Sequence, residues 1–488
     1  MNPASLEPHT AIASALRSRS VAGALILLLC ACTSLPQQDA DQVPFVIPST
    51  WSASDAAVAS DASSLATWWL RFDDPLLSRL IVEALTANHS VRGAQAALLQ
   101  ARALRDVTAA ALWPRLDSLA LAQRSKSGGN PAVNNFRAGF DAAWELDIFG
   151  ANQSALDAGD ATVRASSASL GDVQVSIAAE VALDYITLRG AQAQLAIAAD
   201  NLASQLATLQ MAQWRLQAGL IDSLESEQAR TLAEQTRARL PALQSGVEQI
   251  AHALAVLTGQ PPADLASILA TPAPVPQAAG DLVLAIPAET LRQRPDVRAA
   301  EYQVSAAAAR VGQAEAARLP NFQLGGSLGL SALTLGALGN SAAVASALLA
   351  SVSLPVFDGG ALRAQVRAQQ AALDAARVAY QATVLTALKD VEDALVALHG
   401  NRERLSYLQR AAVAAASAAR LARQRYGSGL IDFQTVLDTQ RSQLAAQDSV
   451  ASAGAELAAN HVRLYKALGG GWRSDGGEAL PSPTPASP

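Results

Sequence analysis

Alternation of apolar and polar residues marks four candidate β-strands in this chain of 488 residues. In the second strand, aromatic and aliphatic side chains alternate with Arg137, Asp141 and Glu145, so these charged residues share one face. The first strand alternates poorly. Strands with one apolar and one polar face are typical of a transmembrane β-barrel, whose lumen Arg137, Asp141 and Glu145 would then line. A water-soluble β-sandwich has the same alternation. The strands are expected at about residues 113–125, 133–149, 319–331 and 341–357.

Two segments of roughly 65 residues each contain no proline and are rich in Ala, Gln, Leu and Arg. They predict two helices about 100 Å long. A shorter helix returns after each of them. In the first returning helix, aliphatic residues spaced alternately by three and four form a coiled-coil seam, which Pro241 is expected to kink. The long helices are expected at residues 151–217 and 360–427, and the returning helices at residues 222–257 and 432–468.

The sequence contains an internal repeat at an offset of about 210 residues. The tetrapeptide Gly-Leu-Ile-Asp at residues 219–222 recurs at residues 429–432, and other landmarks recur in the same order. Each half carries a helix, two strands, a long helix, a sharp turn and a returning helix, so a whole structural module is duplicated. The first repeat is expected over residues 66–260 and the second over residues 288–470, with a Pro- and Ala-rich linker at residues 261–287.

Four strands cannot close a barrel, and open sheet edges are not tolerated in lipid. Several chains must therefore share one barrel. Two chains would give eight strands and a lumen filled by side chains, whereas three would give twelve strands and an aqueous pore. We therefore expect a homotrimer with a mainly α-helical fold. Each chain would contribute four strands to a twelve-stranded membrane β-barrel. This barrel would continue into a long α-helical coiled-coil barrel.

Composition narrows the function classes. Hydrophobic residues make up 50% of the chain, yet no segment after residue 32 has the 18 or more consecutive apolar residues of a transmembrane helix. The net charge is −6 and no basic block occurs, which argues against a nucleic-acid partner. The five histidines are scattered and both cysteines lie near the N-terminus, so neither a metal site nor another cofactor is expected.

The N-terminus has the features of an export signal. Arg17 and Arg19 precede an apolar run at residues 21–29, which is too short to span a membrane. The following Leu-Cys-Ala-Cys string resembles a bacterial lipobox, in which Cys32 would be lipidated and would anchor the mature chain. An ordinary signal cleaved nearby is the alternative. The expected segments are a signal peptide at residues 1–31, a lipid-anchored segment at residues 32–65 and a disordered tail at residues 471–488.

One short motif raises an enzymatic alternative. Residues 325–329 (Gly-Gly-Ser-Leu-Gly) fit the G-x-S-x-G pattern of hydrolases. That motif requires a sharp strand-to-helix turn, whereas here it lies in the middle of an alternating strand. No nucleotide-binding fingerprint is present. We therefore expect no catalytic residues and no enzyme activity.

Three motifs carry a family resemblance. Residues 291–301 (LRQRPDVRAAE) resemble the RPD(I/V)RxAE signature of the TolC-type outer-membrane factors, specifically of the NodT-type efflux lipoproteins. Residues 144–150 (WELDIFG) and 354–360 (LPVFDGG) resemble the strand-to-helix exits of that family, and the motifs keep their order from about residue 65 to about residue 470.

The resemblance implies a homotrimeric barrel in the outer membrane and an α-helical tunnel across the periplasm. Members dock on a periplasmic adaptor protein and an inner-membrane pump, commonly of the resistance-nodulation-division type, and pass drugs or other small molecules out of the cell. Some relatives serve type I protein secretion, which stays as the alternative. The chain would then be part of a passive, gated duct. Its lipid anchor would lie in the outer membrane, and its helices would extend into the periplasm. A general porin would not need helices about 100 Å long.

The resemblance also implies a periplasmic gate at the helix turns. Gly219, Leu220, Gly429 and Leu430 would form the tips that contact the adaptor. The family's aperture aspartate corresponds to Asp438. Asp432 is a second candidate for the aperture, although its position also predicts a helix N-cap. Gln434 occupies the position where relatives have a leucine, which favours a polar closure of the aperture. Possible salt-bridge partners are Arg363, Arg367 and Arg425.

Overall fold

The computed structural model describes Trp51 and residues 65–278 and 294–472. It divides into two compact units. The described part of the first unit consists of residues 106–158 and 307–373. The described part of the second unit consists of Trp51 and residues 65–105, 159–278, 294–306 and 374–472. The expected signal peptide, Cys32 and most of the expected N-terminal segment, linker and tail lie outside the described residues.

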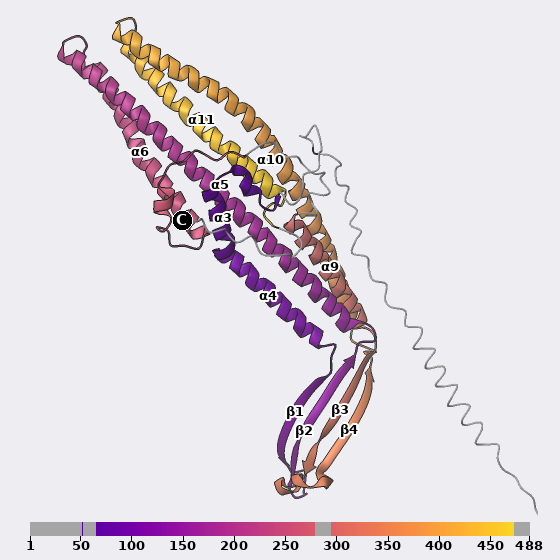
Figure 1. The fold of residues 1–488 in the computed structure, drawn as a ribbon. Coiled ribbons are helices and arrows are strands. Elements are labelled where there is room, and N and C mark those ends of the chain that lie inside the picture. Colours follow the sequence, from indigo (N-terminus) through magenta and orange to yellow (C-terminus); the bar gives the residue numbers. More distant parts are fainter. Residues whose placement is uncertain (1–50, 52–64, 279–293, 473–488) are drawn as a thin grey trace, which may run out of the picture. The chain divides into compact units, whose positions relative to one another are not determined.

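The first unit contains one antiparallel sheet (Figure 1). Its strands are β1 (Arg115–Ser125), β2 (Val133–Leu146), β3 (Asn321–Ala332) and β4 (Val344–Ser353), in the order β1-β2-β3-β4. The pairing of β2 with β3 joins the two sequence halves. Two short 3-10 turns, Leu335–Gly339 and Ser341–Ala343, connect β3 to β4.

Register explains why the first strand alternates poorly. Directly paired residues share a face, and Leu121 lies opposite Arg137 while Asp117 lies opposite Asp141. β1 therefore places leucines on the otherwise polar face. At the centre of the sheet, Gly139 is paired with Gly329, and a Cβ on Gly139 would lie 2.6 Å from the Gly329 Cα. Only residues without a side chain allow the two backbones to approach so closely.

Helices enter and leave the sheet in a repeated pattern. α4 (His89–Ala110) precedes β1 and α9 (Pro295–Ala316) precedes β3. The two long helices, α5 (Ala151–Gln217) and α10 (Ala361–Gly427), follow β2 and β4. The exit turns use left-handed glycines, and after β4 the Asp358 carboxylate accepts a hydrogen bond from the backbone N–H of Leu362 at 2.7 Å. Among the described residues, no helix has a stretch long and apolar enough to cross a membrane.

Each long helix forms an antiparallel hairpin with a shorter one (Figure 1). α5 pairs with α6 (Ser223–Leu257), and α10 pairs with α11 (Phe433–Ala467). Pro241 lies inside α6 and does not end it. The four strands and the helix order expected for each half are thus confirmed.

The second unit buries three separate hydrophobic clusters, of which the smallest consists of Val297, Val384 and Ala387. The body cluster is formed by α3 (Pro75–Ala87), the adjoining Trp68–Phe72 turn and parts of α5, α6, α10 and α11. In it the Trp68 ring stacks on the Tyr465 ring, with centroids 5.2 Å apart. The tip cluster lies near the hairpin turns and consists of Leu209, Ala212, Ala229, Leu232, Ala422, Tyr426, Phe433, Val436 and Leu437.

Candidate functional site

The sheet has one polar and one apolar face. Arg137, Asp141 and Glu145 share the polar face, where the Arg137 guanidinium lies 3.4 Å from the Asp141 carboxylate and Asn321 donates to Glu145 at 2.6 Å. On the other face Phe140 pairs with Leu328, and both side chains are more than half exposed. Exposed aromatic and aliphatic side chains on one face and charges on the other suit a sheet between hydrocarbon and water.

Both hairpin turns have the same backbone construction. Gly219 and Gly429 have positive φ angles of 71° and 74°, which favour glycine, and an aspartate follows each of them as the N-cap of the next helix. Asp222 accepts from the Leu224 N–H at 2.9 Å, and Asp432 accepts from the Thr435 N–H at 2.7 Å. The capping role expected for Asp432 is therefore confirmed, and Asp222 caps α6 in the same way.

Two leucines make the turns apolar at their surface. Leu220 and Leu430, one residue after each turn glycine, are each 72% exposed. Three apolar side chains further along the second hairpin, Phe433, Val436 and Leu437, are buried instead. The centre of the Phe433 ring lies 5.1 Å from that of the Tyr426 ring.

Asp438 is held in a polar group on the exposed face of α11. Its Oδ1 accepts from Gln434 Nε2 at 3.0 Å and from Arg441 Nη1 at 2.8 Å. The structure thus brings Asp438 and Gln434 together, and it adds Arg441, which the sequence analysis did not single out. The sequence could have indicated the pair of Asp438 and Arg441, because residues three positions apart in a helix lie on the same face. Arg363 and Arg367 lie instead in the first turns of α10, at the end away from the tip.

A second network, the clasp, joins the two hairpins at the tip. The Arg215 guanidinium donates to the carbonyls of Tyr426 and Gly427 at 3.2 and 3.1 Å, and it lies 4.4 Å from the centre of the Tyr426 ring. The Tyr426 hydroxyl donates to Glu225 Oε2 at 2.7 Å. Burial, followed by the hydrogen bond to Glu225, raises the pKa of Tyr426. Helices α5, α6 and α10 are therefore linked through one tyrosine.

The clasp was not expected from the sequence. Arg215 is one of the positions that recur in both halves, with Arg425 as its counterpart, but Tyr426 corresponds to Leu216 at the offset of about 210 residues. The sequence could have pointed to Tyr426, because it is an aromatic residue next to a turn at a position where the first repeat has a leucine. The bond to Glu225 could not be predicted, because it depends on how two hairpins pack.

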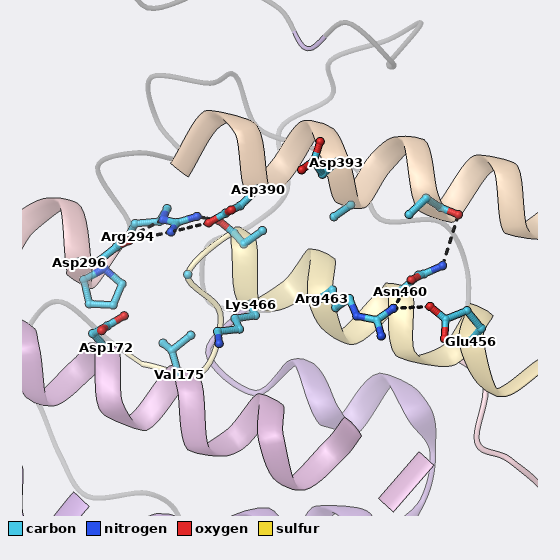
Figure 2. Close-up of a pocket in the computed structure, with 15 residues that line it drawn as sticks. Asp172, Val175, Arg294, Asp296, Asp390, Asp393, Glu456, Asn460, Arg463 and Lys466 are labelled. Atoms are coloured by element: carbon cyan, nitrogen blue, oxygen red, sulfur yellow. Dashed lines mark hydrogen bonds and ion pairs between the residues drawn. The ribbon is translucent and has the colours of Figure 1, made fainter. Parts of the chain in front are cut away.

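The family signature lies at a charged cavity in the second unit (Figure 2). The cavity has a volume of about 450 Å³ and is lined by residues of α5, α9, α10 and α11. Arg294, in the signature, pairs with Asp296 at 2.7 Å and with Asp390 at 3.3 Å, and it donates to the Ala467 carbonyl at 2.8 Å. One buried arginine thus connects the start of α9 with α10 and the end of α11.

The other charges of this cavity also serve the local structure. Arg463 donates to Glu456 at 2.6 Å and to Asn460 at 2.5 Å. Burial, followed by repulsion from Asp296, raises the pKa of Asp172. Within the described part of the chain, no group of three or more His, Cys, Asp or Glu residues is placed to hold a metal ion.

Comparison with known proteins identifies this architecture. The family model described as "Outer membrane efflux protein" matches residues 80–260 and 286–470, one segment in each sequence half. The chain is 31% identical over 462 residues to the solvent efflux pump outer membrane protein SrpC of Pseudomonas putida, covering 92% of this chain and 97% of SrpC. Outer membrane protein OprJ of Pseudomonas aeruginosa is also 31% identical, over 93% of this chain and 96% of OprJ.

Two further comparisons bear on the expected family and fold. Nodulation protein T of Rhizobium leguminosarum is 29% identical over 93% of this chain and 94% of that protein. The solved structure of the outer-membrane channel OprN superposes with a TM-score of 0.81 and 37% identity, covering 88% of this chain and 99% of OprN. The expected resemblance and fold are confirmed: the chain belongs to the outer membrane efflux protein family and is the outer-membrane channel component of an efflux system.

Proposed function

We propose that three copies of this chain form one passive, gated duct, which receives small toxic molecules from a periplasmic adaptor and an inner-membrane pump of the resistance-nodulation-division type. The observation that carries the proposal is the two-faced, four-stranded sheet with a free edge on each side. In the described chain, β1 and β4 each pair on one side only. Three copies supply twelve strands, which is enough to close a barrel around a water-filled lumen.

An unpaired face of α10 supports the same assembly. Six large side chains on this helix are exposed by about half or more, and all but Val413 share one face, namely Val378, Leu385, Val396, Tyr407 and Leu421. They follow one another at close to whole numbers of helical turns, so they form one stripe along the helix. We name them the α10 stripe. A neighbouring copy of the chain would cover it and remove this apolar surface from water.

The polar lumen and the tip fit a gated duct. Arg137, Asp141 and Glu145 would line the barrel, and three copies of the group of Gln434, Asp438 and Arg441 would surround the aperture. Asp432 would contribute its charge to the aperture while capping α11. The adaptor would contact the turns at Gly219, Leu220, Gly429 and Leu430, of which the two leucines are exposed.

Two further features belong to the proposal. The lipobox-like string supports lipidation of Cys32, which replacement by serine should abolish in a palmitate-labelling experiment. No step of the proposed transport is catalytic, and Ser327 of the G-x-S-x-G string lies in the middle of β3 rather than at a strand-to-helix turn.

The test combines assembly with transport. The purified chain in detergent should have three times the mass of the monomer by light scattering, and it should form ion-conducting channels in planar bilayers. Deleting its gene should increase sensitivity to toxic small molecules. A monomer without conductance would overturn the proposal, and loss of an exported protein with unchanged drug sensitivity would favour type I secretion.

A further inference from the structure

Each of the four long hairpin helices carries a glycine in the section between the body cluster and the tip, and α5 has two more, Gly159 and Gly171, nearer its start. The glycines of this section are Gly190 in α5, Gly246 in α6, Gly400 in α10 and Gly454 in α11, and we name them the glycine belt. Gly190 and Gly400 correspond to each other at the offset of about 210 residues. Glycine is rare inside stable helices, because its backbone loses more conformational entropy on folding than that of any other residue.

Contacts place the belt at one level of the second unit. A Cβ on Gly190 would lie 3.0 Å from the Ala455 Cβ, and Asn401, next to Gly400, donates to the Ala453 carbonyl at 3.1 Å. Three of the helices therefore meet within a turn of Gly454. α6 runs parallel to α11, and its Arg239 pairs with Asp448 at 3.1 Å, which places Gly246 near Ala455 two turns further along.

Packing does not require three of these glycines. A Cβ added to Gly246, Gly400 or Gly454 would meet no atom within 4 Å in the described structure. Alanine, which is abundant in this chain, would fit there and is about fivefold more favourable in a helix interior. Within one chain, the three residues thus lower the helical stability of α6, α10 and α11 without a gain in contacts. Gly400, one helical turn after Val396, also borders the α10 stripe.

Between the belt and the tip, α5 and α11 meet through a buried polar seam. Asn201 donates to Gln447 at 2.7 Å, and Gln440 donates to Thr208 at 2.8 Å. Gln205 is only 2% exposed, yet neither atom of its side-chain amide has a hydrogen-bond partner among the described residues. Such a seam is held less firmly than an apolar one, because buried polar atoms without partners favour separation and hydration.

The belt lies beside the end of the body cluster, and the seam runs from there into the start of the tip cluster, where Thr208 precedes Leu209. On α5 the body cluster ends at Leu188, and the tip cluster, with the residues packed against it, begins at Leu206. The helices are therefore held by apolar packing on both sides of a section that contains glycines and polar contacts. Such a section bends more easily than the helices on either side of it.

We propose that the glycine belt and the polar seam form the hinge at which the tip moves when the channel opens. The proposal rests on the proposed function, since it names the segment that controls the aperture. The tip cluster and the clasp would move as one body, while the body cluster stays fixed. Alanine at the belt should stiffen the hinge, and an apolar residue at Gln205 should hold the seam closed.

The experiment compares three variants of the full-length trimer in planar bilayers. The first is the triple variant Gly246→Ala, Gly400→Ala, Gly454→Ala, and the second is Gln205→Met, which keeps the length of the side chain. The matched control is Gly93→Ala in α4, because a Cβ at Gly93 also meets open space. We expect at least a fivefold lower open probability for the triple variant, a smaller decrease for Gln205→Met and no change for Gly93→Ala.

Hydrogen exchange on the same samples separates the hinge from the channel function. In the wild-type chain, backbone amides next to Gly246, Gly400 and Gly454 should exchange at least tenfold faster than amides inside the body cluster. The reference amides are Leu254 in α6, Val391 in α10 and Val462 in α11. Slow exchange at the belt would overturn the hinge even if the channel conducts. So would a triple variant that opens as often as Gly93→Ala. A wild-type chain that does not conduct would instead contradict the proposed function.

Discussion

The two hairpins have the same dimensions but different surfaces. α5 and α10 each have 67 residues, and α6 and α11 each have 35. α5 is buried at many positions by its own chain, including Val181, Tyr185 and Leu188 in the body cluster. α10 instead carries the exposed α10 stripe. The two copies of the duplicated module thus kept the lengths of their helices. Their side chains differ, so that α5 is covered by its own chain, whereas the α10 stripe is left for a neighbouring copy of the chain to cover.

The tips differ in the same way. Both turns keep Gly-Leu-Ile-Asp, so their backbones agree. The second hairpin carries the polar group of Gln434, Asp438 and Arg441, while the first supplies Arg215 and Glu225, which hold Tyr426 of the second. We conclude that the first hairpin supports the tip and that the second carries the groups proposed to close it.

The largest expected effect comes from charging the α10 stripe. Val396→Asp would place a carboxylate in the proposed contact between copies, where an unpaired charge is strongly unfavourable. We expect the ratio of trimer to monomer, measured by light scattering, to decrease at least a hundredfold. Val413→Asp is the matched control, since Val413 is 69% exposed but lies off the stripe. If both variants remain trimeric, the stripe is not the contact between copies.

The second prediction breaks the clasp. Tyr426→Phe removes the hydrogen bond to the Glu225 carboxylate, and bonds to charged groups contribute about 1.5–3 kcal/mol. The side chains are partly exposed, so we expect about a tenfold higher open probability in planar bilayers. Tyr302→Phe is the control, because among the described residues the Tyr302 hydroxyl bonds to Arg298 on its own helix, α9. Equal open probabilities for the two variants would show that the clasp does not restrain the tip.

The fold could be predicted from the sequence to a large extent. Strand alternation, helices without proline and the repeat are local or periodic signals, and the structure contains the corresponding elements. The N-caps at Asp222 and Asp432 were predictable for the same reason, because a cap depends on the residues just after it. The weak alternation of β1 could be understood only from its register, which places Leu119 and Leu121 on the polar face of the sheet.

The candidate site was less predictable. Asp438 followed from the family motif, but its partner Arg441 and the bond between Tyr426 and Glu225 depend on side-chain positions. Contacts between residues about 200 positions apart are set by the packing of one hairpin against the other, and no local pattern encodes them.

The third prediction concerns the charge of the proposed aperture. Asp438→Ala should abolish block by Mg²⁺ and raise the conductance, because it removes three carboxylates from the pore. Arg441→Gln should strengthen the block about threefold, since it leaves Asp438 without its cationic partner. Arg230→Gln on α6 is the control, because this arginine pairs with Glu227 on the other hairpin. A block that is the same in all of these channels would exclude Asp438 from the aperture.

The smallest expected effect tests the caps of the two hairpins. Hydrogen bonds from the Thr435 backbone N–H and hydroxyl lower the pKa of Asp432. The cap is therefore fully present above the ordinary aspartate pKa of about 3.9, and it is lost as the pH falls through the lower folded value. Below that value, protonation should speed amide exchange at Thr435 about threefold beyond the intrinsic effect of pH.

Asparagine separates the cap from its charge. Asp432→Asn keeps a side-chain acceptor but cannot titrate, so exchange at Thr435 should be slow at every pH. Asp432→Ala should make it fast at every pH. The same substitutions at Asp222 should leave Thr435 unchanged, because that cap bonds to Leu224 in the first hairpin. If exchange at Thr435 in the asparagine variant still depends on pH as in the wild type, a group other than Asp432 is responsible.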